Sequence, residues 1–131
     1  TTKQNIVSDT NDNIALRWEN SASPTAPAFI PVVGGTFYTV TAAPALSTST
    51  WVHVCGTYDG ETAILYINAA SRATDTTPTG NLSTLNTGRI GVHSGGSANP
   101  FVGTLDEIRV YSRALGADEI SAIYRRGRIA R

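Results

Sequence analysis

Short runs of β-branched and aromatic residues alternate with turn-forming clusters along this chain. Such spacing is typical of an all-β sandwich or barrel. Runs of this kind predict eight strands, at Gln4–Val7, Ile14–Glu19, Ala28–Val33, Thr36–Thr41, Trp51–Tyr58, Ala63–Asn68, Arg89–His93 and Gly103–Tyr111. Residues that tolerate positive φ mark three hairpin turns, at Asn11-Asp12-Asn13, Gly34-Gly35 and Asp59-Gly60. Long connections are expected at Ala43–Thr50, Ser71–Thr87 and Ser94–Pro100.

The strand pair around Asp59-Gly60 is the clearest local unit. Alternation divides its first strand into two faces, one formed by Val52, Val54 and Tyr58 and the other by Trp51, His53 and Cys55. Both faces are substantially apolar, which predicts a central strand and not an edge strand. Ala63–Asn68 returns antiparallel and is also apolar on both faces.

One helix is expected, after Leu115. Ile120, Ile123 and Tyr124 are spaced i, i+3 and i+4, so they form one apolar stripe. Asp118 and Glu119 fall in the first turn, where the helix dipole favours negative charge. The sequence therefore predicts a short amphipathic helix packed on the sandwich.

Composition limits the classes of partner. The chain has 131 residues, the size of a single domain spanning 1–131, with 10 basic and 10 acidic residues. A net charge of zero provides no long-range attraction for nucleic acid, and no apolar run approaches the roughly 20 residues that span a bilayer. Cys55 is the only cysteine, so no disulfide forms within the chain. The sequence has no Met and begins at Thr1, so we expect a processed product or part of a longer precursor.

Two segments carry a family resemblance. The first is Trp51-Val52-His53-Val54-Cys55-Gly56-Thr57-Tyr58-Asp59-Gly60, with Leu65-Tyr66-Ile67-Asn68. It is similar to the strand, turn and returning strand of the laminin-G-like domains of the concanavalin-A-like superfamily. Phe101–Leu115, followed by Glu119-Ile120, resembles its closing strand, corner and final helical turn. The resemblance implies a two-sheet antiparallel jelly roll and a domain that binds glycans or proteins outside the cytoplasm, as a module of a secreted, cell-surface or virion protein.

The chain departs from the family pattern in three places. The family's opening strands have no counterpart here, Gly116 replaces the usual serine at the start of the terminal helix, and Cys55 replaces an alanine. The first departure leaves Gly103–Tyr111 without an early strand beside it. We therefore expect another chain, a separate precursor segment or strand exchange between copies to fill the vacancy, unless Gln4–Val7 re-pairs into it.

Asp106 is the candidate metal ligand. In an extended strand it shares a face with Ile108 and Val110, so it is expected to point inward. An inward carboxylate needs a cation or several hydrogen bonds, and the resemblance implies a structural Ca²⁺ at the sandwich rim. The alternative is an aspartate that accepts hydrogen bonds from a neighbouring loop. The oxygen-rich segment Asp9–Asn13 is read as a hairpin turn, because it lacks the glycine and distal glutamate of an EF-hand loop.

Three aromatic residues, Trp18, Tyr38 and Tyr66, are candidates for stacking on sugar rings, with packing in the core as the alternative. Catalysis finds little support. Asp59-Gly60-Glu61 is a turn and the adjacent Asp106 and Glu107 point to opposite faces, so no acid/base pair is predicted. The sequence favours a non-enzymatic module that binds a carbohydrate or acts in adhesion. The alternative is a structural subunit of a virion surface, pilus-like filament or cell-surface lattice.

Overall fold

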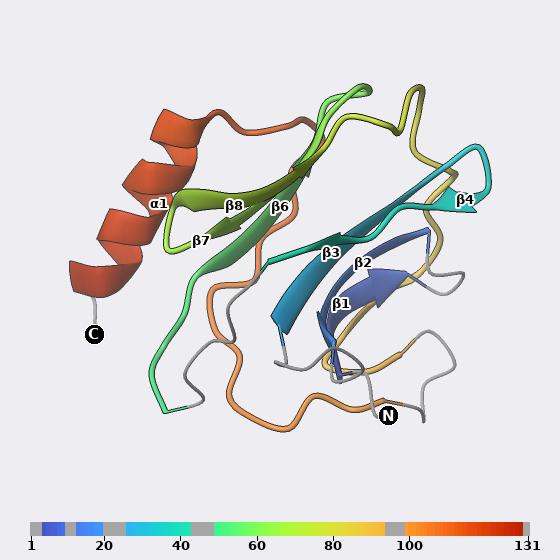
Figure 1. The fold of residues 1–131 in the computed structure, drawn as a ribbon. Helices are drawn as coiled ribbons and strands as arrows, with labels where there is room; N and C mark the ends of the chain where they lie inside the picture. Colours follow the sequence, from blue (N-terminus) through green and yellow to red (C-terminus); the bar gives the residue numbers. More distant parts are fainter. Residues whose placement is uncertain (1–3, 10–12, 20–25, 43–48, 94–98, 130–131) are drawn as a thin grey trace.

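The computed structural model describes residues 4–9, 13–19, 26–42, 49–93 and 99–129. Its elements are β1 (Gln4–Asp9), β2 (Ile14–Glu19), β3 (Ala26–Val33), β4 (Thr36–Phe37), β5 (Val40–Thr41), β6 (Val54–Tyr58), β7 (Ala63–Ile67), β8 (Ala70–Asp75), β9 (Gly88–Ile90) and α1 (Ala117–Ile129). The strands form two antiparallel sheets, and α1 lies beside the smaller one (Figure 1). The predicted two-sheet sandwich with one short C-terminal helix is confirmed.

The larger sheet has the order β4-β3-β2-β1-β9, with β5 also pairing with β3. The predicted strand Thr36–Thr41 is divided into β4 and β5. Both receive their hydrogen bonds from β3, which contains Pro27 and Pro31. The Pro31 carbonyl accepts from the Tyr38 amide at 3.1 Å, but a proline has no N–H to return the bond. The ladder is therefore interrupted at Tyr38.

The smaller sheet has the order β6-β7-β8, so β7 is its central strand and β6 is an edge. The expected hairpin is present: Gly60 has a φ of 106°, and Asp59 Oδ1 accepts from the amides of Glu61 and Thr62 at 3.0 and 2.7 Å. These two bonds lower the pKa of the Asp59 carboxyl. The prediction of a central position for Trp51–Tyr58 is wrong. Both faces of this segment are apolar because the core covers one and α1 covers the other. Two apolar faces do not show whether a strand has neighbours on both sides within its sheet.

β8 lies within a segment that was expected to be a loop, Ser71–Thr87. Its residues are mostly exposed and polar, so alternation gave no signal for a strand. Pairing with β7, with Ile64 opposite Thr74 and Leu65 opposite Ala73, forms it nevertheless. Tertiary pairing here decides a conformation that local sequence leaves open.

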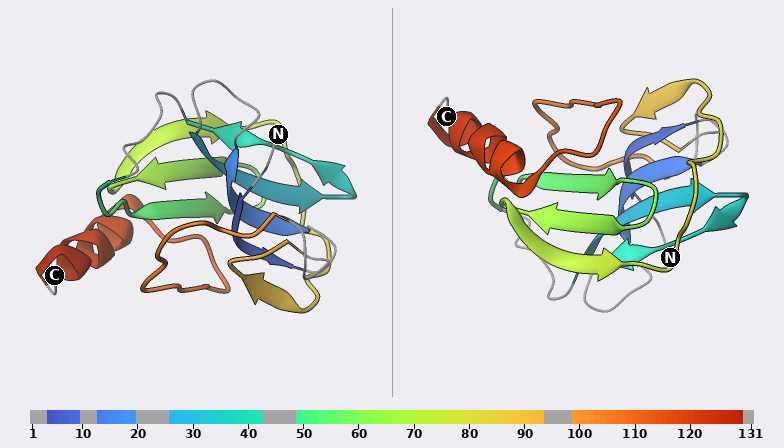
Figure 2. Two further views of the ribbon diagram at one scale, coloured as in Figure 1. Left: turned by 90° about the horizontal axis from the view of Figure 1, so that it is seen from below. Right: turned by 90° about the horizontal axis from the view of Figure 1, so that it is seen from above.

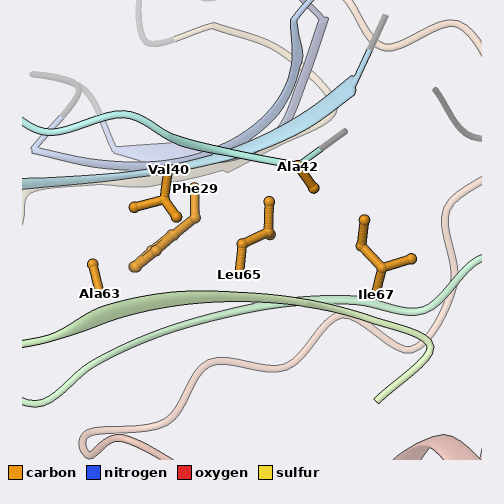
Figure 3. Packing of buried hydrophobic residues seen from close by; sticks show 6 residues of the cluster. All are labelled: Phe29, Val40, Ala42, Ala63, Leu65 and Ile67. Atoms are coloured by element: carbon orange, nitrogen blue, oxygen red, sulfur yellow. The ribbon is translucent and has the colours of Figure 1, made fainter. Parts of the chain in front are cut away.

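The core lies between the two sheets. Phe29, Val40 and Ala42 of the larger sheet pack against Ala63, Leu65 and Ile67 of β7, as Figure 3 shows. Val54 and Tyr58 of β6, with Val52 just before it, pack against this cluster, which confirms the predicted face.

α1 covers the other face of the smaller sheet. Ile120 is fully buried against Tyr66 and Leu115, and the His53 ring lies 5.8 Å from that of Tyr124. The predicted apolar stripe is confirmed. Although Gly116 has no side chain to cap the helix, Glu119 Oε2 accepts from its amide at 2.9 Å, as the fourth residue of a capping box does.

The predicted closing strand is not formed. Residues 103–111 carry no strand, and the chain there runs along one side of the molecule between the larger sheet and α1 (Figure 2). Two residues have positive φ, Gly103 at 155° and Glu107 at 53°, so the alternation of an extended strand does not continue through the segment. Its two ends are held, by a 2.8 Å bond from the Phe101 amide to the Gly91 carbonyl and by burial of Leu115.

Candidate functional site

A cavity of about 780 Å³ lies between the two sheets on the side of β6. Residues of β1, β2, β6 and the segment 101–111 line it; we call it the groove. Its lining is largely apolar and includes the aromatic residues Trp18, Phe29, Trp51, Phe101 and Tyr111. A concave, mostly apolar site of this size is of the kind that binds small or extended ligands.

Close packing forms the floor of the groove. A Cβ placed on Gly56 would lie 2.3 Å from two carbons of the Phe29 ring, so the ring lies directly on the β6 backbone. Only glycine allows this approach. The sandwich core therefore forms the floor of the groove and fixes the depth of the groove.

Large apolar side chains are exposed at the mouth of the groove. Trp51 is 55% exposed, Tyr111 45%, Val110 76% and Val102 77%. All four line the groove and come from the two segments on either side of its opening. Exposed apolar residues that gather around a cavity, and are not scattered singly, mark a surface for interaction.

The three aromatic residues expected to contact ligand lie in different places. Trp18, in β2, is half-buried and lines the groove. Tyr38 lies between β4 and β5, outside the groove. Tyr66 is buried with Leu115 and Ile120 under α1, so its ring packs in the core. Of the three, only Trp18 is positioned to meet a ligand in the groove.

Asp106 does not point into the core. It is exposed, and its Oδ1 accepts from the amide of Glu107 at 2.8 Å. The expectation of an inward carboxylate was wrong because it assumed a regular strand, and Val110, expected on the same core face, is exposed too. In the described part of the chain, no three His, Cys, Asp or Glu side chains gather as metal ligands would. Calcium at Asp106 stays a prediction, which melting temperatures in chelator and in millimolar calcium would test.

Asp9, the last residue of β1, has a buried carboxylate. Its two oxygens accept from the amide and side chain of Asn13 and from the amide of Asn86. Hydrogen bonds of this kind compensate a buried carboxylate without a cation. β1 and β2 pair antiparallel across this connection, as the predicted turn requires, although residues 10–12 lie outside the described residues.

Burial shifts the pKa of two side chains at β6, the Cys55 thiol and the imidazole of His53 just before the strand. Burial raises the pKa of the Cys55 thiol, which disfavours the reactive thiolate. Burial lowers the pKa of His53, whose backbone amide donates to Asn68 Oδ1 at 3.0 Å. Glu107 pairs with Arg109 at the rim of the groove.

Trp51 is a groove residue that sequence reasoning did not select as a candidate ligand contact. The alternation of an extended strand places it on the opposite face from Val52. β6 begins only at Val54, so Trp51 lies before the strand and is largely exposed. A tryptophan at the end of a serine- and threonine-rich connection was the available signal.

No helix in the described residues is long and apolar enough to cross a membrane. No curated protein sequence matches the chain. Among solved structures, the chain is similar to the crystal structure of residues 221–444 of an S-layer domain-containing protein from Clostridium thermocellum. The two share 26% identity with a TM-score of 0.53 over 94% of this chain. The chain spans 63% of the length of that structure.

The model of the Laminin_G_3 family, described as concanavalin A-like lectin/glucanases superfamily, matches residues 1–121. The match covers both sheets and the first turn of α1. This chain is therefore a member of the laminin-G-like family of the concanavalin A-like lectin/glucanase superfamily.

Proposed function

We propose that this chain is a non-enzymatic recognition module that works at a cell surface or outside the cell and binds its ligand in the groove. The observation that carries the proposal is the groove itself, with Trp51 and Tyr111 exposed at its mouth and Trp18 on its wall. Aromatic faces of this kind contact both sugars and polypeptide side chains.

One further observation supports recognition over catalysis. The acidic side chains that line the groove, Asp106 and Glu107, are neighbours on one exposed segment. A glycosidase needs two carboxyl groups on opposite sides of the bond that breaks. Family membership includes both lectin-like and glucanase domains, so the arrangement of the acids is the argument for a non-enzymatic role.

A glycan array tests the carbohydrate branch of the proposal. If the ligand is a glycan, Trp51→Ala should abolish binding, because the ring at the mouth of the groove is lost. Phe37→Ala is the matched control: Phe37 is 58% exposed on β4, outside the groove, and its loss should leave binding unchanged. Glucan incubated with the protein should release no oligosaccharide; release would contradict the non-enzymatic role.

A structural subunit of a cell-surface lattice is the second candidate. The similarity to an S-layer domain-containing protein favours it. Ordered assemblies of the purified chain in electron micrographs, with Trp51 and Val110 buried between subunits, would support this role. A monomer that binds a soluble ligand would support the first.

A further inference from the structure

The edge of β6 lacks the features that protect exposed strand edges. Such edges are usually short, charged or interrupted by proline. The other edge of the smaller sheet, β8, carries Arg72 and Asp75, and β9, at one end of the larger sheet, has three residues including Arg89. β6 has five residues, Val-Cys-Gly-Thr-Tyr, with neither charge nor proline. Its sequence is that of a strand with a neighbour on both sides.

Hydrogen bonds at the ends of the β6–β7 pair show which backbone groups are free. The Asn68 amide donates to the His53 carbonyl at 2.8 Å, and the Asp59 amide donates to the Thr62 carbonyl at 3.4 Å. In an antiparallel pair, successive residues of a strand alternately bond to the neighbouring strand and point away from it. His53 and Asp59, at the two ends of β6, bond to the β7 side. Val54 and Gly56 therefore direct their N–H and C=O groups away from β7. Within the described residues, no backbone group bonds to Val54 or Gly56 on that side; the Gly56 carbonyl has only a 3.9 Å contact from Cys55 Sγ.

The segment before α1 forms the opposite side of the opening. In the part of the chain that the structure describes, the backbone of Ile108, Arg109 and Val110 pairs with no strand. The apolar groove lies between this segment and β6.

On the basis of the recognition role proposed above, we infer that the groove binds an extended strand of a separate polypeptide, which adds to β6 as a fourth strand of the smaller sheet. The added strand pairs with Val54 and Gly56 and directs every second side chain into the groove. Those side chains are apolar, because they meet Trp18, Phe29 and Leu105. The addition continues the existing β6-β7-β8 ladder.

A peptide fits this edge better than a sugar does. The donor and acceptor of Val54 repeat at Gly56 after about 6.8 Å, which is the two-residue repeat of an antiparallel strand. Another copy of this chain fits less well. Its segment 103–111, which forms no strand, is held at both ends, at Phe101 and at Leu115, so strand exchange would first have to break those contacts.

The probe is a display library of nine-residue peptides with valine, isoleucine or leucine at alternate positions and random polar residues between them. The control library has the same composition with its apolar residues at helical spacing. We expect enrichment from the first library only. An enriched peptide should slow amide hydrogen exchange at Val54 and Gly56 by about tenfold or more.

N-methylation of the enriched peptide tests the backbone pairing. Methyl groups on the alternate amides that face β6 should abolish binding, whereas an analogue methylated at a single end residue should retain it. Equal binding of both, or no enrichment over the control library, would overturn the inference. Protection of Val54 and Gly56 in a dimer seen by light scattering, without peptide, would overturn it in favour of a second copy.

The outcomes separate this inference from the proposed function. If a glycan binds in a Trp51-dependent manner and no peptide binds, the recognition role stands and the added strand is wrong. If neither binds, both are wrong.

Discussion

At the scale of single residues, the contact between Gly56 and Phe29 sets the spacing of the sheets beside the groove. Gly56→Ala should lower the free energy of unfolding by about 1–3 kcal/mol, because the new methyl group overlaps the ring and the core must shift. Urea unfolding measures the change. Gly88→Ala is the control, since nothing lies within 4 Å of the added Cβ there, and it should change stability by less than about 0.5 kcal/mol. Equal effects of the two would show that Phe29 does not lie on β6.

His53 makes the stability depend on pH near neutrality. Burial lowers its pKa from 6.5 in the folded state, so the unfolded chain takes up the proton first as the pH falls. The contribution of His53 to the free energy of unfolding is therefore fully present above about pH 6.5 and decreases below it, until the folded state is protonated as well.

Urea unfolding between pH 7.5 and pH 5 measures this dependence. His53→Phe should reduce it, since phenylalanine retains the ring beside Tyr124 but does not titrate. His93→Phe, which leaves His53 in place, should preserve it. A wild-type curve that rises as the pH falls would contradict the sign.

At the scale of elements, α1 is capped from its own first turn. Arg113 holds Glu119 through two bonds of 2.8 and 2.6 Å, and Glu119 accepts from the Gly116 amide. These contacts lower the pKa of Glu119 to about 2. The depressed pKa means that the contribution of Glu119 to stability is present above about pH 4.5 and lost as the pH falls toward 2.

Replacing Glu119 with alanine should lower the melting temperature and speed amide exchange at Gly116. Asp118→Ala is a matched control, because it removes the same charge from the same turn. The Gly116 amide donates to Glu119 and not to Asp118, so this substitution leaves the cap in place. If both variants lower the melting temperature equally, the dipole and not the cap is responsible.

The sequence was sufficient for elements whose signal is local. The β6–β7 hairpin was predicted from alternation around Asp59-Gly60, and α1 from the spacing of Ile120, Ile123 and Tyr124. The segment 103–111 has the composition of a strand, but a strand also needs a partner, and none of the described strands pairs with it. β8 shows the converse, since β7 makes a strand of a polar sequence.

At the scale of the whole molecule, the groove could not be predicted from the sequence. Its lining comes from segments that are far apart in the chain, among them β1, β2, β3, β6 and 101–111. Aromatic type alone selected Trp18, which lines the groove, but also selected Tyr66, which α1 buries. Exposure, which depends on where the strands end, distinguishes Trp51 from Tyr66.

The account depends on β6 having a free edge beside the groove. Residue-resolved amide hydrogen exchange of the isolated chain tests this most directly, because β7 bonds to alternate residues of β6. We predict that Val54 and Gly56 exchange about tenfold or more faster than Cys55 and Thr57. Equal protection of all four amides would show that β6 is already paired on both sides, and would contradict both the free edge and the strand addition inferred from it.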